Sequence, residues 1–521
     1  NLHHLYLHCM LIKTYGSAVY GISAQLITVE VDVGKGARTQ IIGLPDNAVK
    51  ESQPRINDDM KNSGYNYPRK EEIINMDPGD IKKEGSAYDL TIAIGVMAAS
   101  ELINTDLLDE TLIMGELSLD GSLLPIKGAL PIAIQAQKDG FKKLIVPKAN
   151  DREAAIVKDL EVYGLDSLKE VVDFLEGEKQ FERTVVDPRN DFADNIEKLI
   201  YDFSDVKGQE NIKRAMEIAA AGGHNIILIG PPGAGKTMLA KRLNTILPPM
   251  NLHEALETTK IHSVAGRLGS NATLMAQRPF RSPHHTISDV ALVGGGNNPQ
   301  PGEISLAHNG VLFLDELPEF KRAVLEVLRQ PLEDRKVTIS RAKFSVDYPS
   351  SLMLVASMNP CPCGYFNHPE KECVCAPGVV QKYLSKISGP LLDRIDIHIE
   401  VTPVKFEELN QTTIEEERSE NIRERVISAR ELQHKRFGKL PIYNNAQMES
   451  NLIRKYCKIN PAATLLLKNA MNKLNLSARA YDRILKVSRT IADLGGSETI
   501  EMEHLAEAIH YRSLDRENWG V

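Results

Sequence analysis

The sequence predicts an α/β protein whose central domain is built around a phosphate-binding loop, with another domain before it and helices after it. Three observations support this prediction. A strand-like apolar run precedes the loop at 230–237, and a helical pattern follows it. A second apolar run ends in two carboxylates, Asp315 and Glu316. Residues 10–175 alternate strand-like and helix-like segments without such a loop, and a chain of 521 residues has room for two or three domains.

The phosphate-binding loop is the most specific feature of the sequence. It matches the motif GxxxxGK[ST] between a predicted strand at 224–229 and a predicted helix at 238–247. Its residues are Gly230, Pro231, Pro232, Gly233, Ala234, Gly235, Lys236 and Thr237. The glycines let backbone N–H groups wrap a polyphosphate, Lys236 offers a charge to the outer phosphates, and Thr237 offers a hydroxyl to Mg²⁺. We therefore predict nucleotide binding rather than a chance Gly/Pro turn, with ATP and Mg²⁺ as the expected ligands.

The apolar run at 310–314 ends in the two carboxylates. Its apolar residues are typical of a central strand in a parallel sheet, whose carboxyl end lies near bound phosphates. We expect Asp315 to hold Mg²⁺ through water and Glu316 to orient and polarise the attacking water. A helix cap or a solvated turn is the alternative for these carboxylates.

The region before the loop contains a recognisable order of elements. We expect a half-buried strand at 24–33, an apolar helix at 89–99, a hairpin-like stretch at 112–128, a helix at 129–139 and a strand at 143–147. This order resembles the catalytic domain of Lon-type proteases. The resemblance implies an α+β fold of the ribosomal S5 domain 2-like kind.

The Lon-like region lacks the residues that a Lon protease uses. Those enzymes need a serine activated by a lysine, and alignment on the protease pattern puts Ala87 and Leu130 at these two positions. Ser86 and Lys127 are the nearest substitutes, and a shift of one position would be needed to use Ser86. We expect a scaffold or a substrate-handling domain rather than a protease.

A polar, Pro-interrupted stretch at 176–200 reads as a linker, and the segment 203–209 precedes a predicted helix at 211–221. A similar D-[IV]-x-G-Q segment lies over the adenine in AAA+ ATPases. That resemblance makes Val206 and Gly208 candidate base contacts, with an ordinary helix-entry turn as the alternative.

Three further residues match positions in AAA+ motors. Asn359 ends an apolar strand at the position called sensor 1, where it would hydrogen-bond the attacking water or the γ-phosphate. Arg394 matches an arginine that reaches the nucleotide of the neighbouring subunit, which implies a ring. Arg479 resembles the sensor 2 arginine of a helical lid. A surface salt bridge is the alternative for each arginine.

The stretches 301–320, 357–375 and 388–401 resemble the ComM/YifB family, which are magnesium-chelatase-like AAA+ proteins with a Lon-like N-terminal domain. The resemblance implies an ATP-driven hexameric DNA motor, a helicase or translocase that promotes branch migration of recombination intermediates during natural transformation. The expected domains are a Lon-like domain at 10–180, a linker at 181–200, an AAA+ core at 201–402 and a helical lid closing over the nucleotide at 403–515.

Two basic segments are candidate DNA contacts. Residues 335–348 read as a hairpin with a basic tip, and related helicases project such a hairpin into the central pore. Arg341 and Lys343 are therefore expected to contact phosphates, with a solvated tip as the alternative. Arg278 and Arg281 open a glycine-containing insertion that suits a mobile substrate loop. The adjacent pair His284 and His285 could instead ligate a metal, although no carboxylate or cysteine has helpful spacing.

Four of the six cysteines lie within fifteen residues, which suits a metal site better than a disulfide framework. They are Cys361, Cys363, Cys373 and Cys375, with His368 between the two pairs. Structural Zn²⁺ wants four soft ligands, but the CxC spacing is tighter than the usual CxxC. Reduced thiols or a redox pair are the alternatives.

The composition narrows the class of protein. A net charge of −8 argues against a surface that coats nucleic acid, but not against a local basic strip. No apolar run has the length of a membrane helix, and the first residues lack the features of a secretory signal. We expect a cytoplasmic protein that begins at Met10, with residues 1–9 an upstream tail.

Other function classes remain open. A metal-insertion motor like the I subunit of magnesium chelatase shares the insertions around the nucleotide motifs, but needs neither the Lon-like domain nor the cysteine segment. An ATP-dependent peptidase is disfavoured by Ala87 and Leu130. A non-catalytic ATP sensor would not need Lys236, Asp315 and Glu316 together with Arg394.

Overall fold

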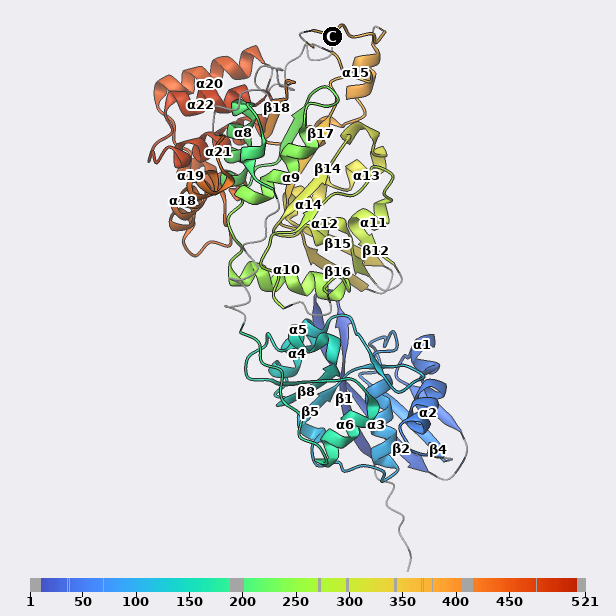
Figure 1. The fold of residues 1–521 in the computed structure, drawn as a ribbon. Coiled ribbons are helices and arrows are strands. Elements are labelled where there is room, and N and C mark those ends of the chain that lie inside the picture. The colour runs from blue at the N-terminus through green and yellow to red at the C-terminus, as the bar shows by residue number, and fades with distance from the viewer. Residues whose placement is uncertain are drawn as a thin grey trace, which may run out of the picture. The chain divides into compact units, whose positions relative to one another are not determined.

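The computed structural model divides the chain into two compact units (Figure 1). It describes residues 11–34, 36, 38–68, 70–187, 201–269, 273–296, 299–341, 344–366, 368, 370–376, 378–403, 416–474 and 476–512. Unit 1 comprises Asn1–Asn195 and Leu252–Met275, and unit 2 comprises Ile196–Asn251 and Ala276–Val521. None of the helices in these described stretches combines the length and the apolar character needed to cross a membrane.

Unit 1 contains a mixed sheet of seven strands in the order β3-β4-β2-β1-β5-β8-β9. The strands are β1 Ile12–Tyr20, β2 Ser23–Gly34, β3 Thr39–Ile42, β4 Glu71–Asp77, β5 Thr111–Ile113, β8 Lys143–Pro147 and β9 Glu161–Leu165. β1, β2 and β4 pair antiparallel, whereas β1, β5, β8 and β9 pair parallel. The short strands β6 Glu116–Leu117 and β7 Leu123–Leu124 form a separate hairpin.

Helices pack on this sheet around one apolar core. They are α1 Asn47–Lys50, α2 Ser52–Asn62, α3 Asp89–Ala99, α4 Ala129–Lys138, α5 Asp151–Ala154, α6 Leu168–Glu176 and α10 Leu252–Val264, with the 3-10 turns η1 Leu108–Glu110 and η2 Lys148–Asn150. α3 is buried along nearly all of its length, as its apolar sequence predicts. In β2, buried residues alternate with partly exposed ones, as expected for a strand with one face on the core. The predicted strands and helices of this region are therefore confirmed, with ends that differ by a few residues.

Two segments lie differently from the predicted domain boundaries. α10 packs on α4 in unit 1, where Gly128 N donates to Ser263 O at 3.2 Å, although residues 252–275 follow the phosphate-binding loop in sequence and were expected in the core at 201–402. Residues 181–187 fall inside the predicted linker, yet Thr184 N donates to Val162 O at 2.8 Å and Phe181 packs on the core of unit 1. The rest of the predicted linker, from 188 to 200, lies outside the described residues.

Unit 2 contains a parallel sheet of five strands in the order β11-β14-β17-β10-β18. The strands are β10 Ile226–Ile229, β11 Phe280–Arg281, β14 Val311–Leu314, β17 Met353–Met358 and β18 Ile397–Glu400. Two antiparallel hairpins accompany it, β12 Gly294–Gly295 with β13 Gln300–Pro301, and β15 Lys336–Arg341 with β16 Phe344–Pro349. Because the five strands are parallel, the loops after β10, β14 and β17 meet at one edge of the sheet.

Helices cover this sheet and continue to the end of the described chain. They are α8 Glu210–Gly222, α9 Lys236–Ile246, α11 Asp289–Val293, α12 Glu303–Leu306, α13 Arg322–Glu326, α14 Arg329–Asp334, α15 Val379–Leu384, α16 Gly389–Leu392, α18 Ser419–Phe437, α19 Ser450–Tyr456, α20 Pro461–Lys473, α21 Ala478–Leu494 and α22 Met502–His510. The 3-10 turns are η3 Phe203–Asp205, η4 Leu317–Glu319 and η5 Asn445–Gln447.

The C-terminal helices share one apolar core with the sheet. The sequence of α18 alternates charged residues, as a helix facing solvent would, but one face of the helix is buried. Ile422, Val426 and Ala429 are buried at helical spacing, and α18 contacts α8, α9 and α21. The charges lie on the outer face, and the apolar stripe between them is sparse in the sequence.

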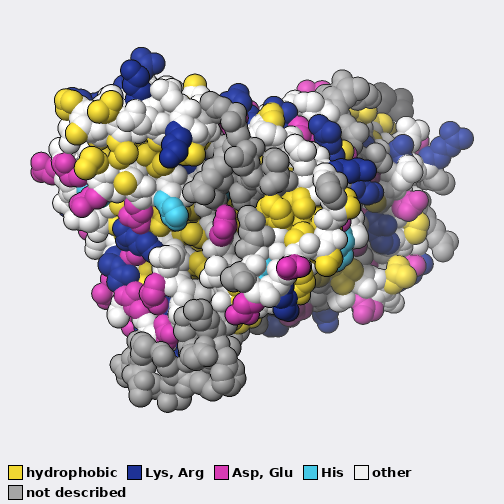
Figure 2. Space-filling model, turned by 90° about the horizontal axis from the view of Figure 1, so that it is seen from above, with side chains coloured by type: hydrophobic (Ala, Val, Ile, Leu, Met, Phe, Trp, Pro, Cys, Tyr) yellow, Lys and Arg dark blue, Asp and Glu magenta, His cyan; other side chains and the backbone are white. Residues whose placement is uncertain are grey.

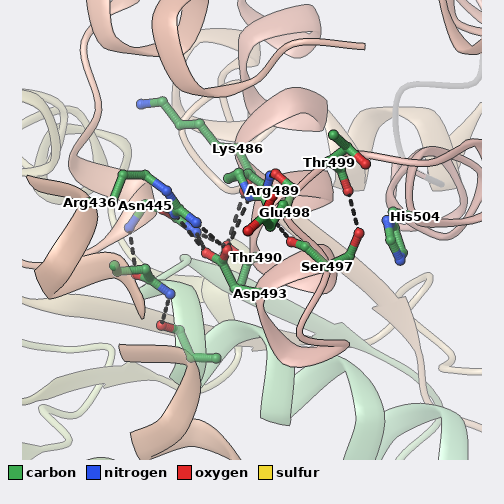
Figure 3. A network of polar contacts seen from close by, with 12 residues as sticks. Arg436, Asn445, Lys486, Arg489, Thr490, Asp493, Ser497, Glu498, Thr499 and His504 are labelled. Atoms are coloured by element: carbon green, nitrogen blue, oxygen red, sulfur yellow. Dashed lines mark hydrogen bonds and ion pairs between the residues drawn. The ribbon is translucent and has the colours of Figure 1, made fainter. Parts of the chain in front are cut away.

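A buried polar network ties the C-terminal helices together. In Figure 3, Arg436, Asn445 and Arg489 converge on Asp493, whose carboxylate accepts hydrogen bonds from all three. Asn445 also donates to Thr490 Oγ1 at 3.0 Å. Charged and amide groups buried in this way need partners, so the network fixes how α18, η5 and α21 pack.

Candidate functional site

The phosphate-binding loop joins β10 to α9, as the sequence predicts. Gly233 and Gly235 have φ of +80° and +83°, which L-residues with a Cβ rarely adopt, and the loop needs glycine at both positions. Gly235 is the N-cap of α9, whose first residue is Lys236. The free N–H groups and the positive end of the helix dipole therefore face the loop, an arrangement that suits an anion.

Lys236 and Asn359 meet at this edge of the sheet. The Lys236 ammonium donates to Gly230 O at 2.7 Å, to Pro231 O at 2.9 Å and to Asn359 Oδ1 at 3.1 Å. Burial lowers the pKa of Lys236, while the charges of Asp315 and Glu316 act in the opposite direction. The structure thus brings the predicted sensor amide directly onto the loop lysine.

The first carboxylate lies beside the loop threonine. Thr237 Oγ1 donates to Asp315 Oδ2 at 2.7 Å, and Ser357 Oγ donates to Asp315 Oδ1. A hydroxyl and a carboxylate oxygen are ligand types that Mg²⁺ prefers. Because these two side chains lie next to each other, they fit the expected cation. Ser357 comes from β17, which lies between β10, the strand before the loop, and β14, the strand that ends just before Asp315.

Glu316 follows Asp315 directly, and its side chain lies near His285. Its φ is +54°, it begins the turn η4, and its side chain is 57% exposed, so the carboxylate is accessible. His285 Nδ1 lies 3.6 Å from Glu316 Oε2, and the His284 and His285 rings stack with centroids 4.1 Å apart. His285 therefore faces a predicted catalytic carboxylate. The cysteine cluster described below is the group of metal-ligating side chains found among the described residues, and the two histidines are not in it.

The segment before α8 reaches the loop through a residue that the sequence did not single out. Gln209 Nε2 donates to Ala234 O at 3.3 Å and to Thr402 O at 3.1 Å. Val206, a predicted base contact, is buried in the core of unit 2. The N–H of Gly208 donates to Glu416 Oε1 at 3.0 Å and is already satisfied. The roles of Val206 and Gly208 toward a base stay predictions.

Arg394 lies at the opposite edge of the sheet from the loop, because it precedes β18 and β18 runs parallel to β10. Its guanidinium donates to Pro390 O at 2.6 Å and pairs with Glu333 at 2.7 Å. Asn225, at the start of β10, donates from Nδ2 to Arg394 O at 2.9 Å.

Arg479 lies at the same edge as Arg394. It is 58% exposed and 3.7 Å from Asp393. Within one chain, neither arginine is placed to touch the phosphates bound by its own loop. The role of Arg479 toward a nucleotide stays a prediction.

The two arginines of the insertion are structural, which argues against their predicted role in DNA contact. Arg278 donates to Pro248 O at 2.7 Å and to Asn309 O at 2.6 Å. Arg281 forms a bidentate pair with Glu303 at 2.6 and 2.7 Å. Guanidinium donors engaged in this way hold short elements in place and are not free to bind phosphate. The insertion expected to be one mobile loop contains β11, α11 and the β12–β13 hairpin.

The predicted basic hairpin is present as β15 and β16, paired from Lys336↔Pro349 to Arg341↔Phe344. At its base, Lys336 pairs with Asp347 at 2.8 Å and Thr338 Oγ1 donates to the same carboxylate at 2.6 Å. Lys343 and the side chain of Arg341 lie outside the described residues, so their contact with DNA stays a prediction.

The four cysteines converge to a single cluster, and each is a free thiol. Cys361 Sγ lies 3.2 Å from Cys363 Sγ and 3.7 Å from Cys373 Sγ, Cys363 and Cys373 are 3.5 Å apart, and all four sulfurs including that of Cys375 lie within 4.8 Å of one another. A disulfide bond is about 2.05 Å long. The edge of a tetrahedron with metal–sulfur bonds of about 2.3 Å is about 3.8 Å, so the spacing fits a tetrahedral thiolate site.

Local contacts affect the four thiols unequally. Desolvation acts to raise the pKa of Cys363, but hydrogen bonds from the Tyr365 backbone and from Cys361 outweigh it and hold that pKa below the ordinary thiol value, whereas the pKa values of Cys361, Cys373 and Cys375 are raised. His368 Nδ1 accepts from Glu370 N and Lys371 N at 3.0 and 3.1 Å, which turns this nitrogen to the backbone. The cysteines alone therefore supply four ligands.

The positions of the Lon dyad carry no catalytic groups. Leu130 is fully buried in α4, and its N–H donates to Glu153 Oε1 at 2.9 Å. Ala87 is partly buried and has no nucleophile, while Lys127, the nearest lysine considered, is exposed. These side chains cannot form the serine–lysine pair that Lon chemistry requires.

Comparison with known proteins gives matches along nearly the whole chain. The family models described as "Magnesium chelatase, subunit ChlI", "Subunit ChlI of Mg-chelatase" and "Magnesium chelatase, subunit ChlI C-terminal" match residues 202–409, 29–150 and 416–512. The uncharacterized protein YifB of Escherichia coli is 45% identical over 501 residues, which is 96% of each chain. Competence protein ComM of Haemophilus influenzae is 44% identical over 503 residues, covering 96% of this chain and 97% of ComM. The chain belongs to the ComM/YifB family of magnesium-chelatase-like proteins.

Membership of the ComM/YifB family agrees with the fold of both units. Lon protease 2 of Bacillus subtilis is 32% identical over 153 residues, 27% of each chain, which supports the Lon-like part of the prediction. The parallel sheet of unit 2, with its loop, fits an AAA+-like core, and the family points to an ATPase that uses ATP and Mg²⁺.

Sequence reasoning missed several residues around the ComM/YifB nucleotide site. Ser357 lies in β17, two residues before Asn359. Residues two apart in an extended chain point to the same side, so this spacing was a signal that could have identified Ser357. Gln209 donates hydrogen bonds to Ala234 O and Thr402 O, and Asn225 to Arg394 O. These partners are far away in the sequence, and a local pattern does not encode them. His285 was considered only as a metal ligand, and its carboxylate neighbour comes from another strand.

Proposed function

We propose that the chain is an ATP-dependent DNA motor, a helicase or translocase that promotes branch migration of recombination intermediates, as in natural transformation. The observation that carries the proposal is the convergence of Lys236, Thr237, Asp315 and Asn359 at one sheet edge, with Glu316 exposed beside them. The 44% identity to a protein named as a competence protein supports the recombination context.

The chemistry follows from these side chains. Lys236 binds the outer phosphates, Asn359 orients the γ-phosphate or the attacking water, and Glu316 polarises that water. Thr237 and Asp315 hold Mg²⁺, which neutralises charge on the phosphate oxygens. Ser357 fixes the Asp315 carboxylate, and the Asn359–Lys236 contact keeps both groups in register before nucleotide arrives.

The position of Arg394 supports a ring, because a residue at the far edge of the sheet serves the next subunit better than its own. In this proposal Arg394, whose side chain is 6% exposed, exchanges its ion pair with the half-exposed Glu333 for the neighbouring nucleotide. It then stabilises the charge of phosphoryl transfer in trans within a hexameric homo-oligomer. Arg479, exposed at the same edge, contacts that neighbouring nucleotide as well, instead of closing over the nucleotide of its own chain.

DNA contacts are assigned to the tip of the β15–β16 hairpin, through Arg341 and Lys343. On the face drawn in Figure 2, basic and acidic side chains are interspersed with hydrophobic ones, which agrees with the net charge of −8 and with a local rather than a face-wide DNA contact. Arg278 and Arg281 are left out of the interface because their donors are engaged.

For the cysteine cluster we assign a structural Zn²⁺ bound by Cys361, Cys363, Cys373 and Cys375, on the sulfur spacing given above. ATP consumption and free thiols both suit the cytoplasm. The sulfur spacing favours this assignment over a redox pair.

A second candidate function is a magnesium-chelatase-like ATPase subunit that drives metal insertion or protein remodelling. The family models named for the ChlI subunit favour it. ATP hydrolysis measured with single-stranded, duplex and branched DNA separates the two. Stimulation by branched DNA supports the DNA motor, whereas equal rates with and without every DNA favour the chelatase-like function.

A further inference from the structure

The cysteine segment is joined to the nucleotide site at two points. The first is covalent, because Asn359 is separated from Cys361 only by Pro360. The second is a packing contact between Gly364 and Pro232 of the phosphate-binding loop. A Cβ on Gly364 would lie 2.5 Å from Pro232 Cδ, so the Gly364 backbone packs against the Pro232 ring as closely as glycine allows.

The turn between these two points is organised around a sulfur. Cys361 is fully buried, Gly364 N donates to its carbonyl oxygen at 3.0 Å, and Phe366 N donates to its sulfur at 3.3 Å. Gly364 has φ of +86°, which this turn needs. The position of Gly364 against the loop therefore depends on where the Cys361 sulfur is held.

The return segment is held by sulfur as well. Cys373 Sγ contacts the sulfurs of Cys361 and Cys363 at 3.7 and 3.5 Å. Metal binding by thiolates releases protons and stabilises only the folded arrangement of the ligands, so it orders the segment that carries them. Without a cation, ionised thiolates this close would repel one another.

The helix after the cysteines adds a third contact. Tyr383 of α15 is buried, and its hydroxyl is hydrogen-bonded to the main chain of Asn359. The helix that follows the cysteines is therefore also attached to the predicted sensor residue.

We infer that the turn 361–366, held by the metal, forms one wall of the ATP site, and that metal binding by the cysteines and nucleotide binding by the loop stabilise each other. The inference rests on the proposed zinc site and adds a role for it. The zinc positions Asn359 through Cys361, and Pro232 through Gly364, without touching the nucleotide.

Coupling of this kind is reciprocal. If zinc raises the affinity for ATP by a given factor, ATP must raise the affinity for zinc by the same factor. We expect roughly tenfold, within the usual range of such couplings. A structural zinc that is not coupled to the site would leave both affinities unchanged, a factor of one in each direction.

The first experiment uses the full-length protein with its zinc content measured, then removed with a chelator and restored. Binding of a non-hydrolysable ATP analogue is expected to weaken about tenfold on removal and to recover when Zn²⁺ is added back. Recovery separates coupling from unfolding. The affinity for zinc, measured by competition with the chelator, is expected to rise about tenfold with the analogue present.

The second experiment separates the contact from the metal. Gly364→Ala keeps all four cysteines but places a methyl group against Pro232, so analogue binding is expected to weaken while zinc is retained. Gly378→Ala is the matched control, because Gly378, the N-cap of α15 just after the cysteines, has a similar φ of +78° with nothing within 4 Å of the added Cβ. It is expected to keep both zinc and nucleotide affinity.

The possible results distinguish the coupling from the proposed zinc site and from the proposed DNA motor. A purified protein without zinc, and unable to bind it, overturns the zinc site and this inference together. Zinc that can be removed with less than a twofold change in analogue affinity overturns the coupling and leaves the zinc site intact. In either case, ATP hydrolysis stimulated by branched DNA still supports the DNA motor.

Discussion

Asn225 donates a hydrogen bond from Nδ2 to the main-chain oxygen of Arg394 at 2.9 Å, and its Oδ1 accepts from Leu354 N at 2.9 Å. Asn225 directly precedes β10, the strand that ends at the phosphate-binding loop. The short strand β10 therefore connects the loop of one ATP site with the arginine proposed to serve the neighbouring site. An amide at this position fixes the arginine segment relative to the sheet.

Replacing Asn225 with Ala is expected to lower kcat about tenfold or more while leaving the affinity for ATP unchanged, because the loop stays intact and Arg394 loses its anchor. The buried Leu354 N–H loses its partner, which costs about 1–3 kcal/mol of stability. Steady-state ATP hydrolysis and analogue binding check this. Asn62→Ala is the control, since Asn62 also donates to a main-chain oxygen, that of Leu119, but in unit 1. Equal losses in both variants would show a general effect of stability.

Glu316→Gln is expected to abolish turnover and retain ATP-dependent assembly, because the amide cannot polarise water but fills the same space. Hydrolysis assays and size-exclusion chromatography with ATP measure the two properties. Glu319→Gln in the same short turn, where Glu319 pairs with Lys386, should hydrolyse ATP normally. If assembly disappeared in Glu316→Gln, the carboxylate would be structural rather than catalytic.

Replacing Arg341 and Lys343 with Ala is expected to weaken DNA binding and to flatten its dependence on salt. The loss of two phosphate contacts reduces the slope of the logarithm of the DNA-binding constant against the logarithm of the salt concentration. The expected reduction is roughly 1.4–1.8 for each subunit that contacts the DNA. Lys336→Ala is the control on the same hairpin, because Lys336 is paired with Asp347 at the base. A salt slope that stays at the wild-type value would move the DNA site elsewhere.

Asp59 in unit 1 is fully buried, and within the described stretches neither of its carboxylate oxygens has a hydrogen-bond partner. Burial raises its pKa to about 7, and the charges of Asp120 and Asp89 add to this effect. The unfolded chain ionises near pH 4 and the folded unit only near 7, so the ionised carboxylate destabilises the fold. The contribution of Asp59 to the free energy of unfolding is therefore most favourable below about pH 4, and it decreases as the pH rises toward 7.

Asp59→Asn is expected to remove this penalty, raising the free energy of unfolding at pH 8 by on the order of 1–2 kcal/mol and having little effect at pH 4.5. Urea denaturation at the two pH values measures the difference. Asp58→Asn, at an exposed neighbouring position, is the control. An equal gain at both pH values would mean that folding does not shift the pKa of Asp59.

The predictable parts of the fold are those encoded locally. The strands β10, β14 and β17 follow from apolar runs, and Lys236, Thr237, Asp315 and Asn359 meet because each follows or begins an element at the same edge of a parallel sheet. Spacing alone also indicated that the four cysteines form one cluster.

The parts that could not be predicted depend on pairing between distant segments. Arg278 and Arg281 look free in the sequence, but their partners, Asn309 O and Glu303, are about twenty to thirty residues away. α10 follows the loop in sequence yet joins unit 1 because its contacts are with α4. No local periodicity reports such partners.

The central claim is that each ATP is shared by two copies of the chain, and mixing two inactive variants tests it most directly. Glu316→Gln supplies an intact Arg394, and Arg394→Ala supplies an intact loop and Glu316. In rings formed from equal amounts of both, about a quarter of the interfaces combine the two intact halves, so ATP hydrolysis should recover to roughly that fraction of the wild-type rate. Mixed rings that stay as inactive as the separate variants, or a monomer that hydrolyses ATP at the full rate with DNA present, would contradict it.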